Sequence, residues 1–476
     1  MCDRQHSIEL SNINDNEKFS YPIILLKGNI ANRCEIDSLK VQINTHEFPA
    51  SKDVRFFNEK RGQFKVLFRL DPGENVLVLT YCRSKIELNL FFEQSGNPFC
   101  VIPLYIICDG HDGTYQSDDA ENGIENACNK ITLGIELVQS LYAEKLSEKG
   151  FGRKTFTIGS RCSPFYSTLP VEKSKKMTEQ QLWSYFGKEI LQSELFVSDK
   201  LKFIGFISST YYEGILDNDF SYANIKRRTT GNAALGGGGL ALFGTGCLYT
   251  WPNRLEEIIP AFLSNKSVDR SLMMDDSNHR YTYAGCFATT IGSVCHEIGH
   301  IFDLGHTKNG IMGAELDHIN RVFTLITQTE DLPGRIVGHS VQQQTNRRLT
   351  QIKRPGEFLL KYQQQKESDV TYFTDNCAIT LQWHKWFNDY SNSGAISEDN
   401  NCVTRLTFNF ITKHVTSVNS NLKLIEIRDK NDGMLKTFWS FLDTTTDQFQ
   451  IPFDVKLDGL TLFVIDNYGN ILKQDL

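Results

Sequence analysis

The sequence lacks the features that mark membrane-embedded and secreted proteins. Its longest apolar stretch, residues 99–108, has only about half the length that a membrane-spanning helix requires. The first residues run into polar sequence without an apolar core, so we expect no secretory signal. The 12 cysteines are scattered and form no CxxC pair, which predicts reduced thiols in the protein core. We therefore expect a cytoplasmic protein with no membrane partner.

The chain also lacks the charge and the loops of nucleotide or nucleic-acid binding proteins. Its net charge is -7, and we interpret the short basic clusters at residues 226–228 and 347–348 as solvated surface. No GxxxxGK[ST] segment occurs, so a P-loop is not supported. The glycine run at 236–239 fits either a sheet edge that another backbone approaches or a plain flexible loop. We expect no nucleic-acid partner.

What the sequence does contain predicts a multidomain α+β fold in a chain of 476 residues. We divide it into an N-terminal β-sandwich domain (1–98), a central domain (99–395) and a small C-terminal β-domain (396–476). Apolar residues alternate with polar ones around Leu39, Phe64 and Ile86, which is typical of an antiparallel sandwich of immunoglobulin-like type. Alternation returns after Cys402, around Leu406 and Leu422.

The middle of the chain mixes strands and helices. We expect strands at 101–108 and 202–209, a helix that ends at Gly150, and a second helix that begins with a capping box between Thr178 and Gln181. The polar, glutamine-rich stretch 327–369 is predicted to be an insertion or lid. Residues 381–387 are predicted to form a helix that closes this domain.

The most specific motif is the segment from His296 to His306. Two histidines four residues apart, His296 and His300, lie on one face of a helix and can hold one ion, and His306 just beyond the helix end completes a tripod. By chance an HExxH string arises in on the order of 1% of chains of this composition, and a third histidine at a fixed offset is roughly fortyfold rarer. The motif predicts a zinc site with one position open to water.

The residues around the motif predict a packed helix. Apolar residues recur at three- and four-residue steps from Ala284 to Phe302, whereas the histidines fall on the other face. Cys295 points away from the ligand face, so we interpret it as a packing residue. A pair of satisfied core histidines is the plainer alternative, but it leaves Glu297 buried without a purpose.

The segment resembles the metzincin clan of zinc peptidases, whose pattern is HExxHxxGxxH followed by a methionine-containing turn. Met312 fits that turn, and no tyrosine follows it closely enough to be a fifth ligand. More narrowly, the region 100–390 resembles a eukaryotic zinc metallopeptidase family known from yeasts and invertebrates. The chain departs from the clan at Asp303, where the clan has glycine; aspartate tolerates the left-handed conformation that this turn needs. His318, beside Asp317, is an alternative third ligand.

These observations predict an intracellular zinc-dependent endopeptidase that acts on peptide or protein substrates. Zinc lowers the pKa of water to about 7, and Glu297 is placed to act as the general base and to pass the proton to the leaving amine. The alternative is a catalytically latent binding or scaffold protein that uses its β-domains. The presence of Glu297 favours the enzyme, because a binding protein has no chemical use for a base there.

Overall fold

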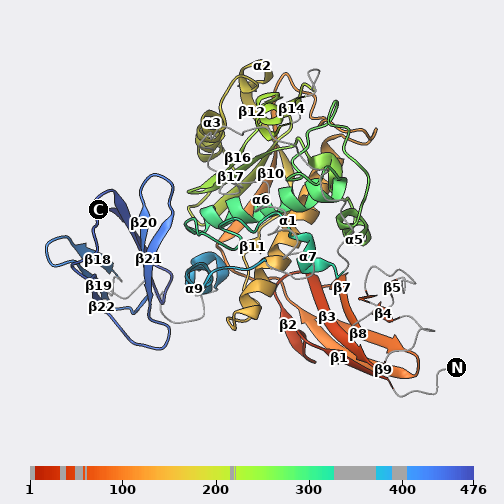
Figure 1. Ribbon diagram of the computed structural model, residues 1–476, viewed down its shortest axis with the longest axis horizontal. Coiled ribbons are helices and arrows are strands. Elements are labelled where there is room, and N and C mark those ends of the chain that lie inside the picture. The colour runs from red at the N-terminus through yellow and green to blue at the C-terminus, as the bar shows by residue number, and fades with distance from the viewer. Residues whose placement is uncertain are drawn as a thin grey trace.

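The computed structural model describes residues 6–32, 39–44, 46–48, 57–58, 62–214, 219, 221–325, 371–388 and 405–476 (Figure 1). The predicted lid at 327–369 lies outside the described residues. In the described part, no helix has both the length and the apolar character that crossing a membrane requires.

The N-terminal region contains two sheets that share one apolar core. The strands of the first sheet are, in spatial order, β1 (Ser7–Leu10), β3 (Ile23–Ala31), β7 (Gln63–Arg69) and β6 (Phe57–Asn58). Those of the second are β2 (Glu17–Phe19), β9 (Ser84–Phe92), β8 (Gly73–Tyr81), β4 (Lys40–Ile43) and β5 (His46–Phe48). Two packed sheets agree with the alternation of the sequence. However, β2 pairs with β9 in parallel, which differs from the all-antiparallel expectation.

The central region is built on a mixed sheet. The strands are β11 (Thr157–Ile158), β10 (Cys100–Asp109), β13 (Leu201–Ile207), β17 (Leu240–Gly244) and β16 (Ala234–Gly237) in spatial order, with β12 (Ser163–Pro170) also paired to β10. All pairs are parallel except β16–β17, so β16 is an antiparallel edge strand. The sheet separates two layers of helices, α1 (Ile124–Glu148) and α6 (Tyr283–Ile301) on one face and α3 (Glu179–Gln192) on the other.

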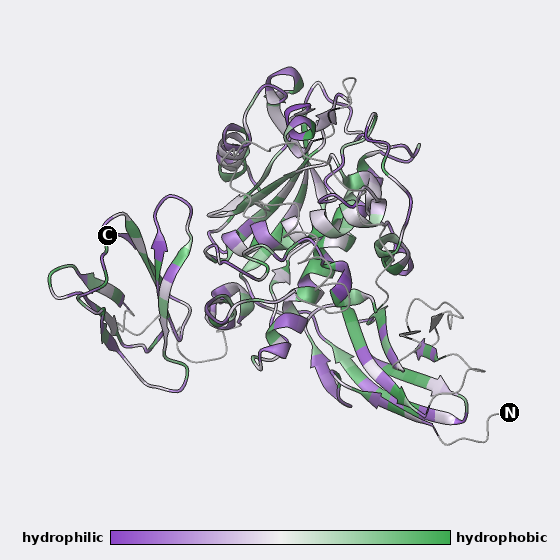
Figure 2. Cartoon of the chain, in the orientation of Figure 1, coloured by the Kyte–Doolittle hydropathy of each residue, from purple (hydrophilic) through white to green (hydrophobic). Residues whose placement is uncertain are grey.

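Apolar runs in the central strands explain this layering. Tyr105 and Ile107 of β10 pack with α1 and α6, whereas Leu104 and Ile106 pack with α3. Both faces of the strands are therefore buried, and Figure 2 shows the apolar character of these strands. The predicted capping box at Thr178 is present and begins α3, and Gly150 follows α1 at φ 82°.

Shorter elements connect this framework. They are α2 (Val171–Ser174), β14 (Tyr211–Tyr212), α4 (Tyr222–Arg227), β15 (Thr229–Thr230), η2 (Leu248–Thr250), η3 (Leu255–Glu257), α5 (Ile258–Phe262), α7 (Asn320–Phe323), α9 (Asp375–Trp383) and η4 (Lys385–Phe387). The helix predicted at 381–387 is thus only partly correct. The α-helix ends at Trp383, because His384 takes an extended conformation with ψ 138°, and a short 3-10 turn follows.

The C-terminal region contains two further antiparallel sheets around a separate apolar core. The strands are β18 (Arg405–Asn409), β19 (His414–Val418) and β22 (Gln448–Gln450) in one sheet, and β21 (Leu435–Ser440), β20 (Leu422–Asp429), β23 (Leu460–Asp466) and β24 (Ile471–Asp475) in the other. Ile379 of α9 packs against Leu424, Phe463 and Ile465, so this region is attached to the central one by apolar contacts.

A buried ionic network joins the N-terminal region to α1. The guanidinium of Arg153 lies 2.6 Å from Glu144 of α1 and 2.7 Å from Glu17 of β2. Lys27 of β3 lies 2.8 Å from the same Glu144. The side chains of Arg153 and Glu144 are almost fully buried, so this ionic contact between the N-terminal region and the central one is shielded from water.

Candidate metal centre

Helix α6 carries two of the three motif histidines. The helix begins at Thr282, whose hydroxyl accepts a hydrogen bond from the N–H of Gly285, and its apolar stripe is buried under the central sheet. This packing fixes His296 and His300 one turn apart on the same face. Their Nε2 atoms lie 3.1 Å from each other.

His306 lies beyond the end of the helix and faces the other two histidines. Its Nε2 atom is 3.0 Å from Nε2 of His300, and one ring nitrogen of each of the three residues lies within 4.8 Å of the others. Among the described residues, these histidines form the only group of three or more potential ligands that converges in this way. The predicted tripod is therefore assembled in space.

The other nitrogen of each imidazole contacts a backbone carbonyl. Nδ1 of His296 lies 2.8 Å from the carbonyl of Ile311, and Nδ1 of His300 lies 2.9 Å from that of Leu304. Nδ1 of His306 contacts the carbonyl of Asp432. Because a carbonyl can only accept, each Nδ1 donates its proton, and the lone pairs of the three Nε2 atoms point toward one another. Such a donor set fits a cation.

The electrostatic environment favours neutral imidazoles. Burial holds the pKa of His300 well below its ordinary value, and the neighbouring rings of His296 and His306 lower it further. A neutral imidazole is the form that binds a metal. Three lone pairs brought together without a proton or cation between them repel, so the arrangement is accounted for by a cation among them.

The turn out of α6 contains the residue that departs from the clan pattern. Asp303 has φ 66°, so aspartate takes the left-handed conformation that the sequence analysis required of it. Its carboxylate lies 3.1 Å from Nε2 of the buried His384 and also contacts Nζ of Lys473. The side chain thus links the turn to the segment after α9 and to β24.

Met312 packs against α6 at Gly299, the residue before His300. A Cβ atom added to Gly299 would lie 2.4 Å from the sulfur of Met312, so the methionine packs against the helix between His296 and His300. Met312 is fully buried, and its carbonyl accepts a hydrogen bond from the N–H of Thr307 at 3.0 Å. The turn that contains Met312 is therefore packed against the helix that carries His296 and His300.

Glu297 contacts the edge strand of the sheet. Its Oε2 atom accepts a hydrogen bond of 2.7 Å from the N–H of Gly236 in β16. A Cβ atom at Gly236 would lie 2.0 Å from the carbonyl oxygen of Glu297, so only glycine permits this approach. The glycine run thus fits the first of the two expectations, and the approaching backbone is that of α6 itself.

His318, the alternative third ligand, is not part of the cluster. Asp317 has a structural role, since its carboxylate accepts a hydrogen bond from Asn278 and its carbonyl accepts one from the buried Arg280. Cys295 is buried away from the site, as expected of a packing residue, and burial raises the pKa of its thiol.

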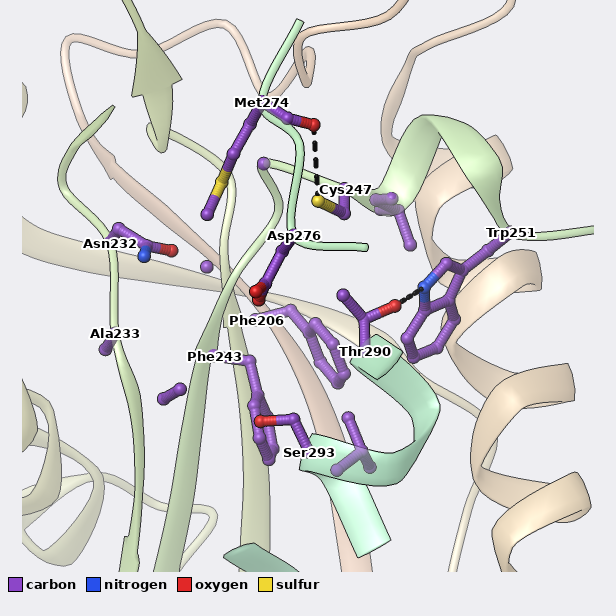
Figure 3. A pocket seen from close by; sticks show the side chains of 15 residues that line it. Phe206, Asn232, Ala233, Phe243, Cys247, Trp251, Met274, Asp276, Thr290 and Ser293 are labelled. Atoms are coloured by element: carbon purple, nitrogen blue, oxygen red, sulfur yellow. Dashed lines mark hydrogen bonds between the residues drawn. The ribbon is translucent and has the colours of Figure 1, made fainter. Parts of the chain in front are cut away.

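A cavity of about 40 Å³ lies between the edge of the sheet and the middle of α6. Figure 3 shows Asp276, Asn232 and Ser293 around it, with Trp251 donating a hydrogen bond of 2.8 Å to Thr290 on one wall. Ser293 lies one helical turn before Glu297. The cavity is therefore adjacent to the histidine cluster and large enough for a few water molecules or the end of a small side chain.

Comparison with known proteins identifies a family and relatives of this chain. The model of a family described as "Putative peptidase family" matches residues 7–382, well over half of the chain. The chain belongs to this peptidase family. It is 25% identical over 346 residues to a "Putative zinc metalloproteinase" of Schizosaccharomyces pombe, with 67% of this chain and 54% of the relative covered. It is 27% identical over 350 residues to one of Saccharomyces cerevisiae, with 66% and 49% covered. The chain thus spans about half the length of these members.

Several residues at the site could not be found from the sequence. The carbonyls of Ile311, Leu304 and Asp432 orient the histidines, but a carbonyl carries no residue-specific signal. For Gly236, the glycine run indicates only that another backbone can approach, and it does not identify Glu297 as the partner of the N–H. The sequence predicts His384 only as part of a helix. In the structure its contact with Asp303 stabilises the turn out of α6.

Proposed function

We propose that this chain is a zinc-dependent endopeptidase of metzincin type, with zinc held by His296, His300 and His306. The observation that carries the proposal is the convergence of three Nε2 lone pairs whose Nδ1 protons are engaged by carbonyls. The spacing of 3.0 and 3.1 Å between these nitrogens is close to the edge of about 3.3 Å expected for a tetrahedron with zinc–nitrogen bonds of 2.0–2.1 Å. The relatives named as zinc metalloproteinases support the same metal.

Zinc in this site would supply Lewis-acid activation of a water molecule and of the substrate carbonyl. Glu297 would act as the general base, since it is adjacent to the first ligand and its carboxylate is held by the N–H of Gly236. One carboxylate oxygen is thus fixed while the other can take up the proton and pass it to the leaving amine. Because the carbonyls hold the proton of each imidazole on Nδ1, the lone pair of Nε2 would face the metal.

The edge strand β16 offers a place for an extended substrate. We propose that a peptide lies along β16, with one side chain near the cavity beside Ser293. This arrangement brings a peptide bond next to Glu297, because Gly236 of the same strand already contacts that residue.

The architecture and setting complete the proposal. We propose domain limits at 1–98, 99–395 and 396–476, with an immunoglobulin-like N-terminal sandwich and a metzincin-like centre. We place the enzyme in the cytoplasm, which is supported by the reduced thiols of its described cysteines, such as Cys108, Cys247 and Cys377.

The test is a comparison of wild-type protein with Glu297→Gln. Glutamine retains a hydrogen-bond acceptor for Gly236 but cannot take up a proton. We expect the variant to bind one equivalent of zinc and to hydrolyse a peptide library about two to four orders of magnitude more slowly. If the zinc-loaded wild-type protein cleaves no peptide in a broad library, the alternative of a latent binding or scaffold protein is favoured.

A further inference from the structure

The loop between β20 and β21, residues 430–433, contacts the third histidine on several sides. The N–H of His306 donates to the carbonyl of Gly433 at 3.0 Å, and the N–H of Leu435 donates to the carbonyl of His306 at 2.9 Å. His306 and Met434 thereby form a parallel β-bridge. The imidazole itself donates from Nδ1 to the carbonyl of Asp432. The backbone and the side chain of His306 are both held by the C-terminal region.

The residues before His306 are held by the same region. Arg428 of β20 donates to the carbonyl of Asp303 at 2.8 Å, and Lys473 of β24 contacts the carboxylate of Asp303. A Cβ atom at Gly305 would lie 2.8 Å from Nε of Arg428 and 2.8 Å from the carbonyl oxygen of Gly433. The turn out of α6 is therefore packed against the C-terminal region at Asp303, Gly305 and His306.

The other two histidines are oriented by carbonyls that lie close to α6 in the sequence. The carbonyls that contact Nδ1 of His296 and His300 belong to Ile311 and Leu304, which lie within about fifteen residues of the helix and inside the region that the family model matches. The loop 430–433 lies beyond residue 382, where that match ends. Only His306 depends on a segment from outside the matched region.

We infer that the C-terminal β-region is a structural part of the metal centre, in which the loop 430–433 positions His306 for metal binding. The inference rests on the proposed function, because it assigns a role toward the zinc ligands. Asp432 is a positioning residue that acts through its backbone carbonyl. It holds the proton on Nδ1, so that Nε2 of His306 presents its lone pair to the metal.

The contribution of such an outer contact is measurable. Partners that orient metal-bound histidines typically change metal affinity by about 10- to 100-fold when they are removed. Without the loop, the backbone of residues 303–306 has no partner strand. Part of the free energy of metal binding must then offset the conformational entropy that this segment loses when it becomes ordered. We therefore expect weaker zinc binding rather than a loss of the fold.

The experiment replaces residues 430–433 by Asn-Gly in the full-length protein. This two-residue turn closes the β20–β21 hairpin and removes the carbonyls of Asp432 and Gly433. The matched control makes the same replacement of residues 410–413, a loop of equal length between the paired residues Asn409 and His414 of β18 and β19. Thermal unfolding of both metal-free variants checks that each is folded.

Two readouts do not depend on activity. Competition with a chromophoric chelator measures zinc affinity, and the visible absorption of the cobalt-substituted protein reports the coordination of the ion. We expect zinc affinity to fall by about 10- to 100-fold and the cobalt spectrum to change in the 430–433 variant. The 410–413 variant should keep wild-type values.

Gly305→Ala tests the same contact without changing a loop. Gly305 does not have positive φ, so alanine meets an obstacle mainly in the C-terminal region. We expect Gly305→Ala to weaken zinc binding by about tenfold in the wild-type background and clearly less in the 430–433 variant, which is the non-additivity of residues in contact.

The outcomes separate this inference from the proposed function. If wild-type protein binds no zinc, the proposed metal site fails. If wild-type protein binds zinc and the folded 430–433 variant has the same affinity and the same cobalt spectrum, the loop does not position His306 and this inference alone is overturned.

Discussion

Asp303 shows how one side chain compensates for an unusual backbone conformation. A non-glycine residue at φ 66° is strained, yet here its carboxylate gains two cationic or polar partners, His384 and Lys473. Burial alone would raise the pKa of Asp303, but the hydrogen bond from His384 and the charge of Lys473 outweigh it and hold the pKa well below its ordinary value. The carboxylate is therefore ionised in the folded protein at neutral pH.

The first prediction is that Asp303→Asn destabilises the protein at neutral pH. The amide keeps the shape of the side chain but loses the charge, and we expect a loss of about 2 kcal/mol in the free energy of unfolding, below the 3–5 kcal/mol of fully buried pairs. A group with a depressed pKa stabilises the fold above its unfolded pKa of about 3.9 and loses that contribution as the pH falls. Urea unfolding at pH 7, pH 3.5 and pH 2 should show the difference beginning to shrink only below about pH 3.9 and shrinking further as the pH approaches the depressed pKa of the folded state.

The control for that prediction is Asp375→Asn. Asp375 forms an exposed ion pair with Lys149 at 2.6 Å and should change stability by less than about 1 kcal/mol. An equal effect of the two substitutions would mean that the contacts of Asp303 do not add to the stability of the turn out of α6.

The second prediction concerns the buried imidazole of His384. Burial lowers the pKa of His384, although Asp303 acts in the opposite direction. The folded protein therefore resists protonation of this ring, whereas the unfolded chain takes up a proton near pH 6.5. Stability that is present above pH 6.5 must fall as the pH drops below it.

The comparison uses metal-free wild-type protein and His384→Gln between pH 7.5 and pH 5. All other histidines are common to the two proteins, so the difference between the two curves isolates His384. We expect the unfolding free energy of the wild-type protein to fall more steeply over this range. Parallel curves would show that His384 is protonated in the folded state.

At the scale of elements, the contact between α6 and β16 joins the helix of the histidines to the edge of the sheet. The third prediction is that Gly236→Ala disrupts it, since the added Cβ meets the backbone of Glu297, which cannot move without shifting the ligands. We expect a loss of about 1–3 kcal/mol in stability, as for overpacked cores, together with reduced peptide hydrolysis.

Gly237→Ala is the matched control. The nearest atom to a Cβ at Gly237 is on the side chain of Trp183, at 4.0 Å, so the same substitution one residue later meets open space. Wild-type stability and activity are expected for it. If both variants keep the same stability and activity, β16 tolerates a shift away from α6. The close approach at Gly236 is then not needed for peptide hydrolysis.

The sequence predicted individual elements better than their connections. The alternation of the flanking strands, the capping box at Thr178 and the apolar stripe of α6 are local patterns, and each is found in the structure. The parallel pairing of β2 with β9 and the end of α9 at Trp383 depend on tertiary contacts, which a local pattern does not contain. The spacing of the motif likewise located the histidines, whereas their carbonyl partners carry no side-chain signal, and the partner of His306 comes from a distant segment.

At the scale of the whole molecule, the N-terminal region is attached to α1 by charged groups that are shielded from water. The fourth prediction is that Arg153→Met costs about 2–3 kcal/mol, because Glu17 and Glu144 lose their common cation. The cost is below the roughly 3–5 kcal/mol of an uncompensated buried charge, since Lys27 remains beside Glu144. Limited proteolysis should then release the N-terminal region at lower urea concentration than in the wild-type protein.

Arg69→Met provides the comparison, because Arg69 also joins the N-terminal region to α1, through Glu136, but its side chain is 41% exposed. An exposed pair contributes about 0–1 kcal/mol, so the attachment should survive its removal. Equal release in both variants would indicate that apolar contacts alone hold the two regions together.

The contact between His306 and the loop 430–433 has a consequence for biosynthesis. The ribosome makes the α6 motif more than a hundred residues before it makes Asp432, so a nascent chain can present two histidines long before the third is oriented. On the inference drawn above, tight metallation has to wait until the C-terminal strands have been synthesised and have docked. The hydrolytic activity proposed for this protein would then arise only in a finished molecule, which protects the translation machinery and the incomplete chain itself from premature cleavage.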